Sequence, residues 1–434
     1  MKWFKSYNIL NQHLISLKME ELDMLVKLGN YLDIKRGPGL PSENYATEGS
    51  LIRLTLGNFN YPNGGFKNNA SKQDIYYSGN VKKEYILKKG DLITPLTEQV
   101  EGLLGETAWI PEDDKYIQNG DIGLVIPFEN VLDKKYCYYL LSSYIIKNQL
   151  SAGAQQTKIR HTSPEKIKDC VAPIPSVDYQ RKIGNILYEI DAQIKRNNEM
   201  VQKLQVLTQS IYSYWFNQFE FPNEEGKPYK SSGGKMVWNE KLKREIPKDW
   251  TINTVKNYCN ITWGQCPDGI NILPLSYNDE NTILYCSGAG DMRNGIVVDC
   301  QAKTNASKRL AHKNDILMSI AGSIGALCIC DKTISLGRAA VAFTQKENQS
   351  LLTYQLINVF ATRMKSVSSG SIQKVINDNH LNDIKFAFSK EIFELYTSKF
   401  NSILEVIINF EHKNKELVHL KEKMLPLLIN GQLI

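Results

Sequence analysis

The chain has 434 residues, 42% hydrophobic and 23% charged, an ordinary composition for a globular protein and enough length for two or three domains. No apolar run is long enough to span a bilayer, and the start of the chain lacks a small-residue cleavage site, which predicts a cytoplasmic protein. Eight cysteines without a Cys-x-x-Cys pair give no zinc or redox framework and predict free thiols, while the net charge of +6 permits a polyanionic partner without requiring one.

Residues 1–180 are predicted to form a first globular domain of mixed helices and strands. Its β-rich runs, such as "EYILKKGDLITPL" and "DIGLVIPF", are bounded by Gly, Asn and Asp, which punctuate strands. The stretch "KKYCYYLLSSYIIKNQL" instead places apolar residues three and four positions apart, as a helix packed on a core does. These patterns predict an α+β domain.

A long helix is predicted next, over residues 181–217. Its apolar seam follows a repeating spacing of four and three residues: Ile183, Leu187, Ile190, Ile194, Asn197, Val201, Leu204, Thr208 and Ile211. A strict period of 3.5 favours a coiled coil over an ordinary surface helix, whose period is 3.6. Asn197, a polar residue, occupies the midpoint of this seam.

The second half of the chain repeats this organisation. A second α+β domain is predicted over residues 218–390, with a linker rich in Gly, Ser and charge at 222–235. A second long helix, over 391–434, has its seam at Ile403, Val406, Phe410, Lys413, Leu417, Leu420, Met424 and Leu427. Each of these residues lies 216 positions after a residue of the first seam, so the chain is predicted to be a duplicated pair of units rather than a solenoid.

Two amphipathic helices that each end a domain can bury each other's seams. We therefore expect an antiparallel coiled-coil spacer between the domains, the alternative being that each helix packs only on its own domain. In the antiparallel arrangement, Asn197 and Lys413 are expected to lie near each other and to mark the register, because a polar seam residue costs stability but fixes alignment. If the helices are offset, each residue would instead face solvent.

The order of several stretches resembles the DNA-recognition (specificity) subunit of type I restriction-modification systems. "APIPSVDYQRKIGNILYEIDAQIKRNNE" is similar to the family's central conserved region, with Gln180 and Arg181 leading into the spacer helix. "SIYSYWFNQFEF" is similar to its Ser-Trp-Phe helix end, and "REIPKDW" to the segment that opens its second recognition domain. "GQCPDG", "ISLGRAAVAF" and "LKEKMLPLLINGQL" resemble the start, middle and end of that second half. The resemblance covers nearly the whole chain.

The resemblance implies a non-catalytic subunit that binds double-stranded DNA. Each target recognition domain would read one half of a bipartite, asymmetric site, while the helical spacer would set the gap and dock two methyltransferase subunits. Restriction-translocase subunits could join, and the complex would direct adenine N6-methylation and cleavage of unmodified DNA. S-adenosylmethionine, ATP and Mg would be held by the partner subunits, with no cofactor in this chain. The alternatives are a specificity subunit of a related, type IIB-like system and a coiled-coil scaffold without a DNA role.

The chain lacks the sequence motifs of the enzymes in such a complex. An adenine methyltransferase grips its flipped base with an Asp/Asn-Pro-Pro-Tyr/Phe loop, and the sequence contains no Pro-Pro pair. Gly-Lys occurs at 226–227 and at 234–235 without the rest of a P-loop, so ATP hydrolysis is not expected. No catalytic residue and no metal site are predicted.

Candidate DNA contacts are polar and basic residues in loops between strands. Lys and Arg bind phosphates, while Arg, Asn and Gln read base edges. In the first domain the candidates are Arg36, Arg53, Asn58, Lys67, Gln155, Gln156, Lys158 and Arg160. In the second they are Gln265, Arg293, Ser323, Arg338, Gln373 and Lys374. The alternative for each is a solvated loop side chain, and for Arg338 also a buried structural role. The two Gln/Lys loops are favoured because both repeats place them at the same point.

Overall fold

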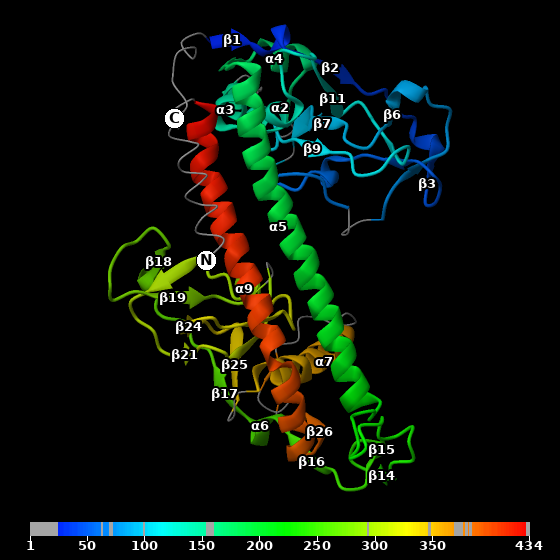
Figure 1. The fold of residues 1–434 in the computed structure, drawn as a ribbon. Helices are drawn as coiled ribbons and strands as arrows, with labels where there is room; N and C mark the ends of the chain where they lie inside the picture. Colours follow the sequence, from blue (N-terminus) through cyan, green and yellow to red (C-terminus); the bar gives the residue numbers. More distant parts are fainter. Residues whose placement is uncertain are drawn as a thin grey trace. The chain divides into compact units, whose positions relative to one another are not determined.

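The computed structural model describes residues 25–61, 64–68, 73–98, 100–152, 160–292, 295–345, 349–368, 376–377, 381 and 384–430. They form two compact units: the described residues up to Ile194 with those from Leu417 onward, and Lys195–Glu416. Two long helices, α5 (Val177–Tyr212) and α9 (Lys390–Ile429), contribute to both units (Figure 1). No helix among the described residues has the length and hydropathy that a membrane span requires.

The first unit is built on a four-stranded sheet of order β2-β11-β7-β9 and a five-stranded sheet of order β3-β5-β4-β10-β6. Their strands are β2 (Leu32–Arg36), β3 (Tyr45–Ala46), β4 (Ile52–Arg53), β5 (Tyr76–Tyr77), β6 (Ile86–Leu87), β7 (Leu92–Pro95), β9 (Ala108–Trp109), β10 (Tyr116–Ile117) and β11 (Ile122–Pro127). Two antiparallel ribbons complete the unit: β1 (Leu25–Lys27) with β13 (Val171–Pro173), and β8 (Thr97–Glu98) with β12 (Arg160–His161).

Short helices and 3-10 turns connect these strands: η1 (Leu28–Asn30), η2 (Ser42–Asn44), η3 (Leu56–Asn58), η4 (Lys83–Tyr85), α2 (Lys134–Leu141), α3 (Tyr144–Ala152) and α4 (Pro164–Asp169). Helix α2 begins where the Asp133 carboxylate accepts a hydrogen bond from the Tyr136 amide at 2.9 Å, a standard N-cap. Its apolar face is buried in one cluster with Ile183 and Leu187 of α5, so α5 is anchored in the core of the first unit.

The second unit repeats the four-stranded sheet, the five-stranded sheet and one of the ribbons in the same order of strands. Its sheets have the orders β17-β25-β22-β23 and β18-β20-β19-β24-β21, and β16 pairs with β26 as β1 pairs with β13. Each five-stranded sheet contains a parallel pair at the same position, β4 with β10 in the first unit and β19 with β24 in the second. Because the rest of each sheet is antiparallel, this shared exception confirms the predicted duplication.

The strands of the second unit are β16 (Thr251–Thr254), β17 (Cys259–Trp263), β18 (Ile272–Pro274), β19 (Ile283–Cys286), β20 (Ala302–Thr304), β21 (Leu310–Ala311), β22 (Ile316–Ser319), β23 (Leu327–Ile329), β24 (Ile334–Leu336), β25 (Ala340–Gln345) and β26 (Lys385–Phe388). Its short helices and turns are α6 (Val255–Tyr258), η6 (Gly269–Asn271), η7 (Ala289–Met292) and α7 (Ser350–Ser368). Helix α7 packs its apolar residues into the core beside β22 and β25.

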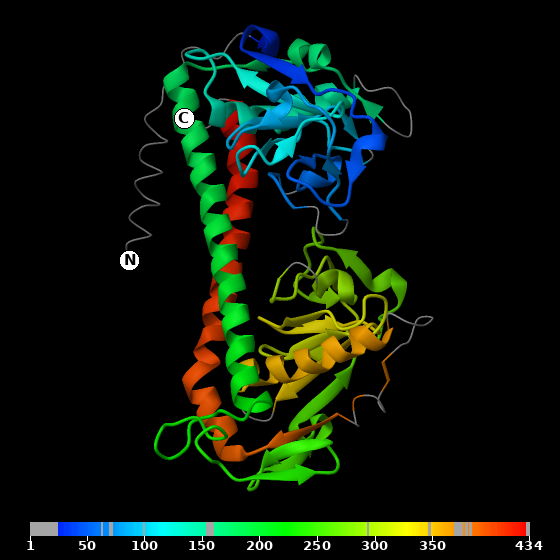
Figure 2. The ribbon, with the colours of Figure 1, turned by 90° about the vertical axis from the view of Figure 1, so that its right-hand side faces the viewer.

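Within each unit, α5 and α9 lie side by side and run in opposite directions (Figures 1 and 2). In the first unit, Lys421 Nζ lies 2.7 Å from Asp191 Oδ1, and Met424 and Leu428 share a buried cluster with the start of α5. In the second, the rings of Trp215 and Tyr396 lie 5.6 Å apart. The predicted α+β fold, with two similar domains and a pair of antiparallel helices, is confirmed, and each helix packs on a domain as well as on its partner.

The predicted seam of α5 is buried or half-buried throughout. On α9, Leu417, Leu420 and Met424 are buried or half-buried as predicted, but at three other positions the seam is shifted by one residue, with Ile407, Asn414 and Leu428 buried in place of Val406, Lys413 and Leu427. The buried residues of α9 include Leu404, Ile407, Asn414, Leu417, Met424 and Leu428. Lys413, predicted to lie on the seam, is exposed, with its ammonium 5.8 Å from the Phe410 ring centre. The prediction failed because apolar residues come in adjacent pairs, such as Ile403–Leu404 and Val406–Ile407, and the sequence does not tell which member faces inward.

The polar partner of Asn197 is therefore Asn414. Asn197 Nδ2 donates to Asn414 Oδ1 at 2.7 Å, and Asn414 Nδ2 donates to Asn198 Oδ1 at 2.8 Å. Asn197 and Asn414 are both buried, so each amide depends on the other for hydrogen bonds that water cannot supply. The polar layer exists as expected, one residue away from the predicted position on α9.

Asn197→Ala is expected to lower the free energy of unfolding by about 1–3 kcal/mol, because the buried Oδ1 of Asn414 loses the donor that Asn197 supplies. The double variant N197L/N414L should regain most of that stability, since an apolar pair of similar size replaces the polar one. Chemical denaturation of the wild type, the single variant and the double variant measures both effects. Lys413→Ala, an exposed change on the same turn of α9, is the control and should stay within about 0.5 kcal/mol of wild type. Equal stability of Asn197→Ala and the control would show that the pair contributes nothing.

The predicted linker at 222–235 is folded rather than flexible. It begins after the π-helical turn η5 (Ser213–Asn217) that ends α5, and the ring of Phe221 stacks between Tyr229 at 4.7 Å and Trp250 at 5.1 Å. A hairpin follows, made of β14 (Met236–Asn239) and β15 (Arg244–Pro247). The polar composition of the segment suggested a loose connection, but its aromatic residues attach it to the core.

Candidate nucleic-acid interface

Both units contain the same close backbone crossing after the first strand of the four-stranded sheet. A Cβ atom on Gly37, after β2, would lie 2.2 Å from the carbonyl oxygen of Asn119. A Cβ atom on Gly264, after β17, would lie 2.0 Å from the carbonyl oxygen of Gly337. Only glycine fits such an approach, so the two glycines place equivalent loops against equivalent turns. We call these places the first and second crossings.

The second crossing presents a cluster of polar and basic side chains. Gln265 and Arg338 are both exposed, which rules out the buried role considered for Arg338. The Gln265 amide donates to the Leu336 carbonyl at 2.9 Å, which fixes the loop against β24. Lys308 Nζ lies 3.5 Å from a carboxylate oxygen of Asp268, in the same loop. Amide and cationic groups thus gather where loop and turn meet, as base and phosphate contacts require.

Between these groups lies the half-buried thiol of Cys266. Its Sγ is 3.2 Å from the hydroxyl of Tyr285. This hydrogen bond, a second one from the Arg338 backbone and the nearby positive charges of Arg338 and Lys308 lower the pKa of the Cys266 thiol. The two hydrogen bonds account for most of this lowering, and the charges of Arg338 and Lys308 add to it.

The first crossing carries fewer of the predicted contacts. Arg36 is exposed at the end of β2, and its Nε donates to the Gly120 carbonyl at 2.7 Å. The Arg53 guanidinium lies 5.0 Å from the ring centre of Tyr45 and is half-buried. Lys67 is exposed. The structure therefore places Arg36 at the crossing. The guanidinium of Arg53 instead contacts the ring of Tyr45.

Two predicted contact residues have structural roles instead. Asn58 is 3% exposed, and its Oδ1 accepts the Thr55 amide at 2.8 Å as part of a capping box on η3. Arg160 pairs with the buried Glu98 at 3.5 Å and with Glu101 at 3.3 Å. The amide of Asn58 is thus used inside the fold, and the charge of Arg160 offsets a buried carboxylate. Sequence reasoning missed both because their partners are set by the loop geometry.

Of the seven remaining predicted contact residues, the structure describes Ser323 only. Ser323 is exposed on the turn between β22 and β23, and its carbonyl accepts the Ser319 hydroxyl at 2.6 Å. The Gln/Lys loops and the second-domain arginine lie outside the described residues: Gln155, Gln156, Lys158, Arg293, Gln373 and Lys374.

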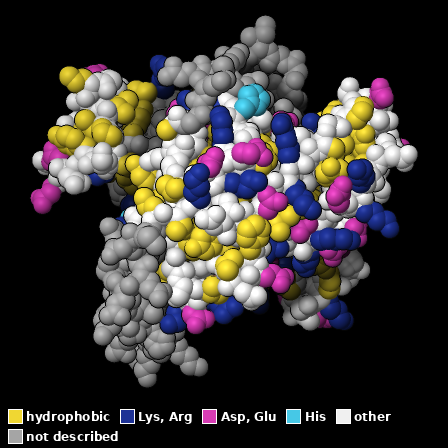
Figure 3. Space-filling model, turned by 90° about the horizontal axis from the view of Figure 1, so that it is seen from above, with side chains coloured by type: hydrophobic (Ala, Val, Ile, Leu, Met, Phe, Trp, Pro, Cys, Tyr) yellow, Lys and Arg dark blue, Asp and Glu magenta, His cyan; other side chains and the backbone are white. Residues whose placement is uncertain are grey.

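Charge alone does not locate an interface. On the face drawn in Figure 3, Lys and Arg side chains lie among Asp and Glu, without a continuous block of one sign. In the part of the chain that the structure describes, no three His, Cys, Asp or Glu side chains gather as metal ligands. All eight cysteines are free thiols, as expected, so no disulfide constrains the loops.

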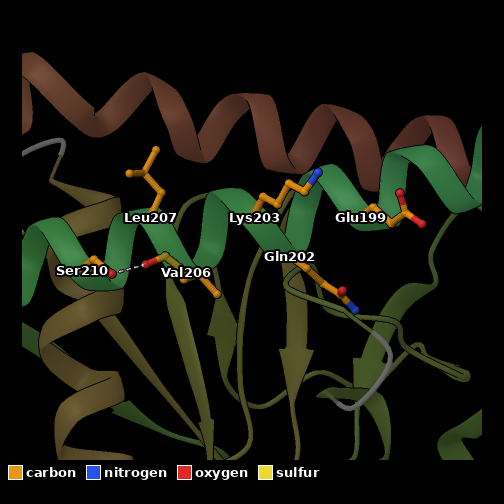
Figure 4. Close-up of a pocket in the computed structure, with 6 residues that line it drawn as sticks. All are labelled: Glu199, Gln202, Lys203, Val206, Leu207 and Ser210. Carbon is orange, nitrogen blue, oxygen red and sulfur yellow. Dashed lines mark hydrogen bonds between the residues drawn. The ribbon is translucent and has the colours of Figure 1, made fainter. Parts of the chain in front are cut away.

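A second surface, not found from the sequence, runs along the outer side of α5 in the second unit. An open groove there is lined by one helical stripe: Glu199, Gln202, Lys203, Val206, Leu207 and Ser210 (Figure 4). Val206 is 65% exposed and Leu207 48% exposed. The seam analysis considered only the inner side of the helix. An exposed apolar centre with polar ends is typical of a surface that another protein covers.

Comparisons with known proteins agree with this architecture. The family model described as the type I restriction modification DNA specificity domain matches residues 24–206 and again residues 247–391, most of the chain. The two matches correspond to the two copies of the repeated topology.

Individual relatives are distant but cover most of the chain. A Methanocaldococcus jannaschii protein named as the type I restriction enzyme MjaX specificity subunit is 23% identical over 84% of this chain and 84% of its own length. The HindI specificity subunit of Haemophilus influenzae is 21% identical over 82% of this chain and 88% of its own length. A crystal structure of a type I restriction-modification S subunit from M. genitalium has a TM-score of 0.60 at 15% identity, and the match covers 95% of this chain and 98% of that one. This last likeness concerns the fold.

Proposed function

Because the chain belongs to the type I restriction-modification DNA specificity family, we propose that it is the non-catalytic subunit that directs such a complex to a bipartite DNA site. The recognition domains are residues 1–180 and 218–390, and the spacer helices are 181–217 and 391–434. The observation that supports this most is that both sheets of one domain repeat in the same order of strands, with different side chains at the two crossings. One scaffold used twice with different loops suits an asymmetric site with two different halves.

The DNA contacts are proposed at the two crossings and at two further exposed positions, Lys67 and Ser323. Arg36 and Lys67 would serve the first half-site, and Gln265, Ser323 and Arg338 the second. Arginine and glutamine have the donors and acceptors for base edges, while lysine suits phosphates. The residues outside the described part of the chain, Gln155, Gln156, Lys158, Arg293, Gln373 and Lys374, remain candidates for the same role.

The partners proposed are double-stranded DNA, two methyltransferase subunits and, in the restricting form, translocase subunits, all in the cytoplasm. Adenine N6-methylation and cleavage would belong to those partners, together with S-adenosylmethionine, ATP and Mg. The family description favours this type I reading over a type IIB-like system. The polar pair of Asn197 and Asn414 would hold the spacer in one register and thereby fix the gap between the half-sites.

Mapping N6-methyladenine in a host with and without this subunit tests the proposal. A split motif is expected only when the subunit is present, with a gap of about 5–8 unspecified bases if the spacer spans roughly one turn of DNA. Replacing residues 27–175 with another recognition domain should change one half of the motif and leave the other half and the gap intact. A motif without a gap, or a change in both halves after the replacement, would contradict it.

The stripe on α5 is proposed as part of the surface that a methyltransferase subunit covers. V206E/L207E is expected to weaken co-purification with the methyltransferase at least about tenfold, because two charges would be desolvated in the interface. Both side chains are exposed, so the melting temperature of the isolated subunit should not change. Val237→Glu, at another exposed apolar residue of the second unit, is the control. If V206E/L207E assembles fully with the methyltransferase in size-exclusion chromatography, the stripe is not part of the methyltransferase interface.

A further inference from the structure

An apolar patch lies next to the second crossing. It consists of four exposed side chains within eight residues: Ile270, Ile272, Leu275 and Tyr277. We call it the 270–277 patch. Ile270 is 86% exposed, the largest value among the exposed apolar side chains of the described residues. Ile270 lies on a turn, Ile272 on an edge strand, and Leu275 and Tyr277 in the segment that follows the strand. Single exposed apolar residues need no explanation, but a group of four within one short segment indicates a surface that is covered in function.

The patch is held in place by the loop of the second crossing. Ile270 lies on η6, which begins at Asp268, where the Asn271 amide donates to the Asp268 carbonyl at 2.9 Å. Ile272 starts β18, the edge strand of the five-stranded sheet. The turn is therefore rigidly placed, and Ile270 projects from a fixed point.

Two lysines lie at the two ends of the segment that carries the patch. Lys308 is 3.5 Å from Asp268, two residues before Ile270. Lys303 Nζ donates to the carbonyl of Tyr277 at 3.1 Å, at the other end of the patch. Arg338 belongs to the same loop cluster through its backbone contact with Cys266. An apolar segment with a lysine at each end, one of them paired with Asp268, can face the bases of DNA while the lysines reach its phosphates.

The first unit lacks this patch. The turn that precedes β3 is η2, and by position Ser42, Glu43 and Asn44 correspond to Gly269, Ile270 and Asn271. An exposed glutamate thus stands where the second unit has Ile270. A surface that only the second recognition domain has suits a partner that differs between the two domains. In an asymmetric DNA site, the two half-sites differ in this way.

We propose that Ile270 contacts the methyl group of a thymine in the half-site read by the second domain, with Lys308 on a flanking phosphate. This rests on the proposed function and adds a base-reading residue to it. The C5-methyl of thymine is the apolar group that the major groove offers, and aliphatic side chains recognise it by contact. Removing water from one methyl group against an aliphatic side chain corresponds to about a fourfold gain in affinity.

The test uses the complete complex with its methyltransferase subunits and the motif defined by methylation mapping. Each thymine of the second half-site is replaced in turn by deoxyuridine, which lacks only the methyl group. One replacement is expected to weaken wild-type binding about fourfold. I270A should weaken binding to thymine-containing DNA by a similar factor and should be insensitive to that replacement. E43A, at the corresponding position of the first unit, is the control and should respond to the deoxyuridine as wild type does.

Several outcomes would overturn the proposal. They are a second half-site without thymine, wild-type binding that no deoxyuridine weakens, or I270A that still responds to the replacement. An increase in 2-aminopurine fluorescence that depends on Ile270 would show a wedge between bases rather than a groove contact. A change of oligomeric state in I270A without an effect on DNA would assign the patch to self-association. In all of these outcomes the wild-type complex still prefers a DNA site with two separated halves, so the proposed function stands. If the wild-type complex had no such preference, the proposed function would be overturned as well.

Discussion

Gly264→Ala is expected to destabilise the second unit by about 3 kcal/mol, the upper end of the usual cost of overpacking. The added Cβ would lie 2.0 Å from the Gly337 carbonyl oxygen and 2.9 Å from that of Ala340, and neither is a flexible side chain that can move aside. The loop and the turn of the second crossing must therefore separate. Chemical denaturation of the isolated subunit measures the loss, and methylation mapping should show weakened discrimination in the second half of the motif.

Two further glycines make this experiment specific. Gly269→Ala lies in the same loop, where an added Cβ has no heavy atom within 4 Å, and should leave stability unchanged. Gly37→Ala, with a Cβ 2.2 Å from the Asn119 carbonyl oxygen, should weaken discrimination in the first half of the motif instead. Identical denaturation curves for Gly264→Ala and Gly269→Ala would show that the crossing tolerates a side chain.

Glu411→Ala is expected to cost about 3 kcal/mol and to loosen the second domain from α9. The Glu411 carboxylate accepts the backbone amides of Ile296 at 2.6 Å and Val297 at 2.8 Å, and burial raises its pKa. Alanine would leave both amides without an acceptor, at about 1–3 kcal/mol for each buried group that stays dry. Glu411→Gln keeps one acceptor oxygen and should recover part of the loss. Hydrogen exchange of the Ile296 and Val297 amides reports the contact directly.

The control for Glu411 is Glu405→Ala, an exposed residue nearly two turns earlier on α9. It should change the unfolding free energy by less than about 0.5 kcal/mol. Two ion pairs near Glu411 remain in every variant, His412 with Asp331 at 2.9 Å and Lys415 with Asp299 at 2.9 Å. If these alone hold the domain, Glu411→Ala will show unchanged amide protection, and the carboxylate will have no share in docking.

The architecture could be predicted from the sequence because it rests on long periodic signals. The seam from Ile183 to Ile211 and the repeat at an interval of about 216 positions specify two helices and two domains without knowledge of any contact. The one-residue shift on part of α9 shows that a periodic pattern does not specify which of two adjacent residues is buried. At adjacent apolar pairs, the inward residue depends on packing against the domain, and Leu404 and Ile407 are the members buried in the core of the second unit.

The site could be predicted only in outline. Arg36, Gln265 and Arg338 are exposed at the two crossings because glycines force those loops together, a constraint visible as Gly37 and Gly264. The buried Asn58 could not be separated from a contact residue, because its partner Thr55 is set by a local turn. In the sequence, nothing distinguishes Ile270 from an isoleucine of a buried strand. Its exposure follows from its place on a turn at the edge of the sheet.

The division of the long helices between the units has a consequence for synthesis of the protein. Met424 and Leu428, which complete the core of the first unit, emerge from the ribosome after the whole second unit. Ile194 and Leu417 are 223 positions apart, which at roughly 5–20 residues per second is a delay of about 10–45 s. Throughout that time the start of α5 has no α9 to cover it. Helix α2 already packs on Ile183 and Leu187, so the nascent first unit has a core that lacks only the contribution of α9 for about half of its translation.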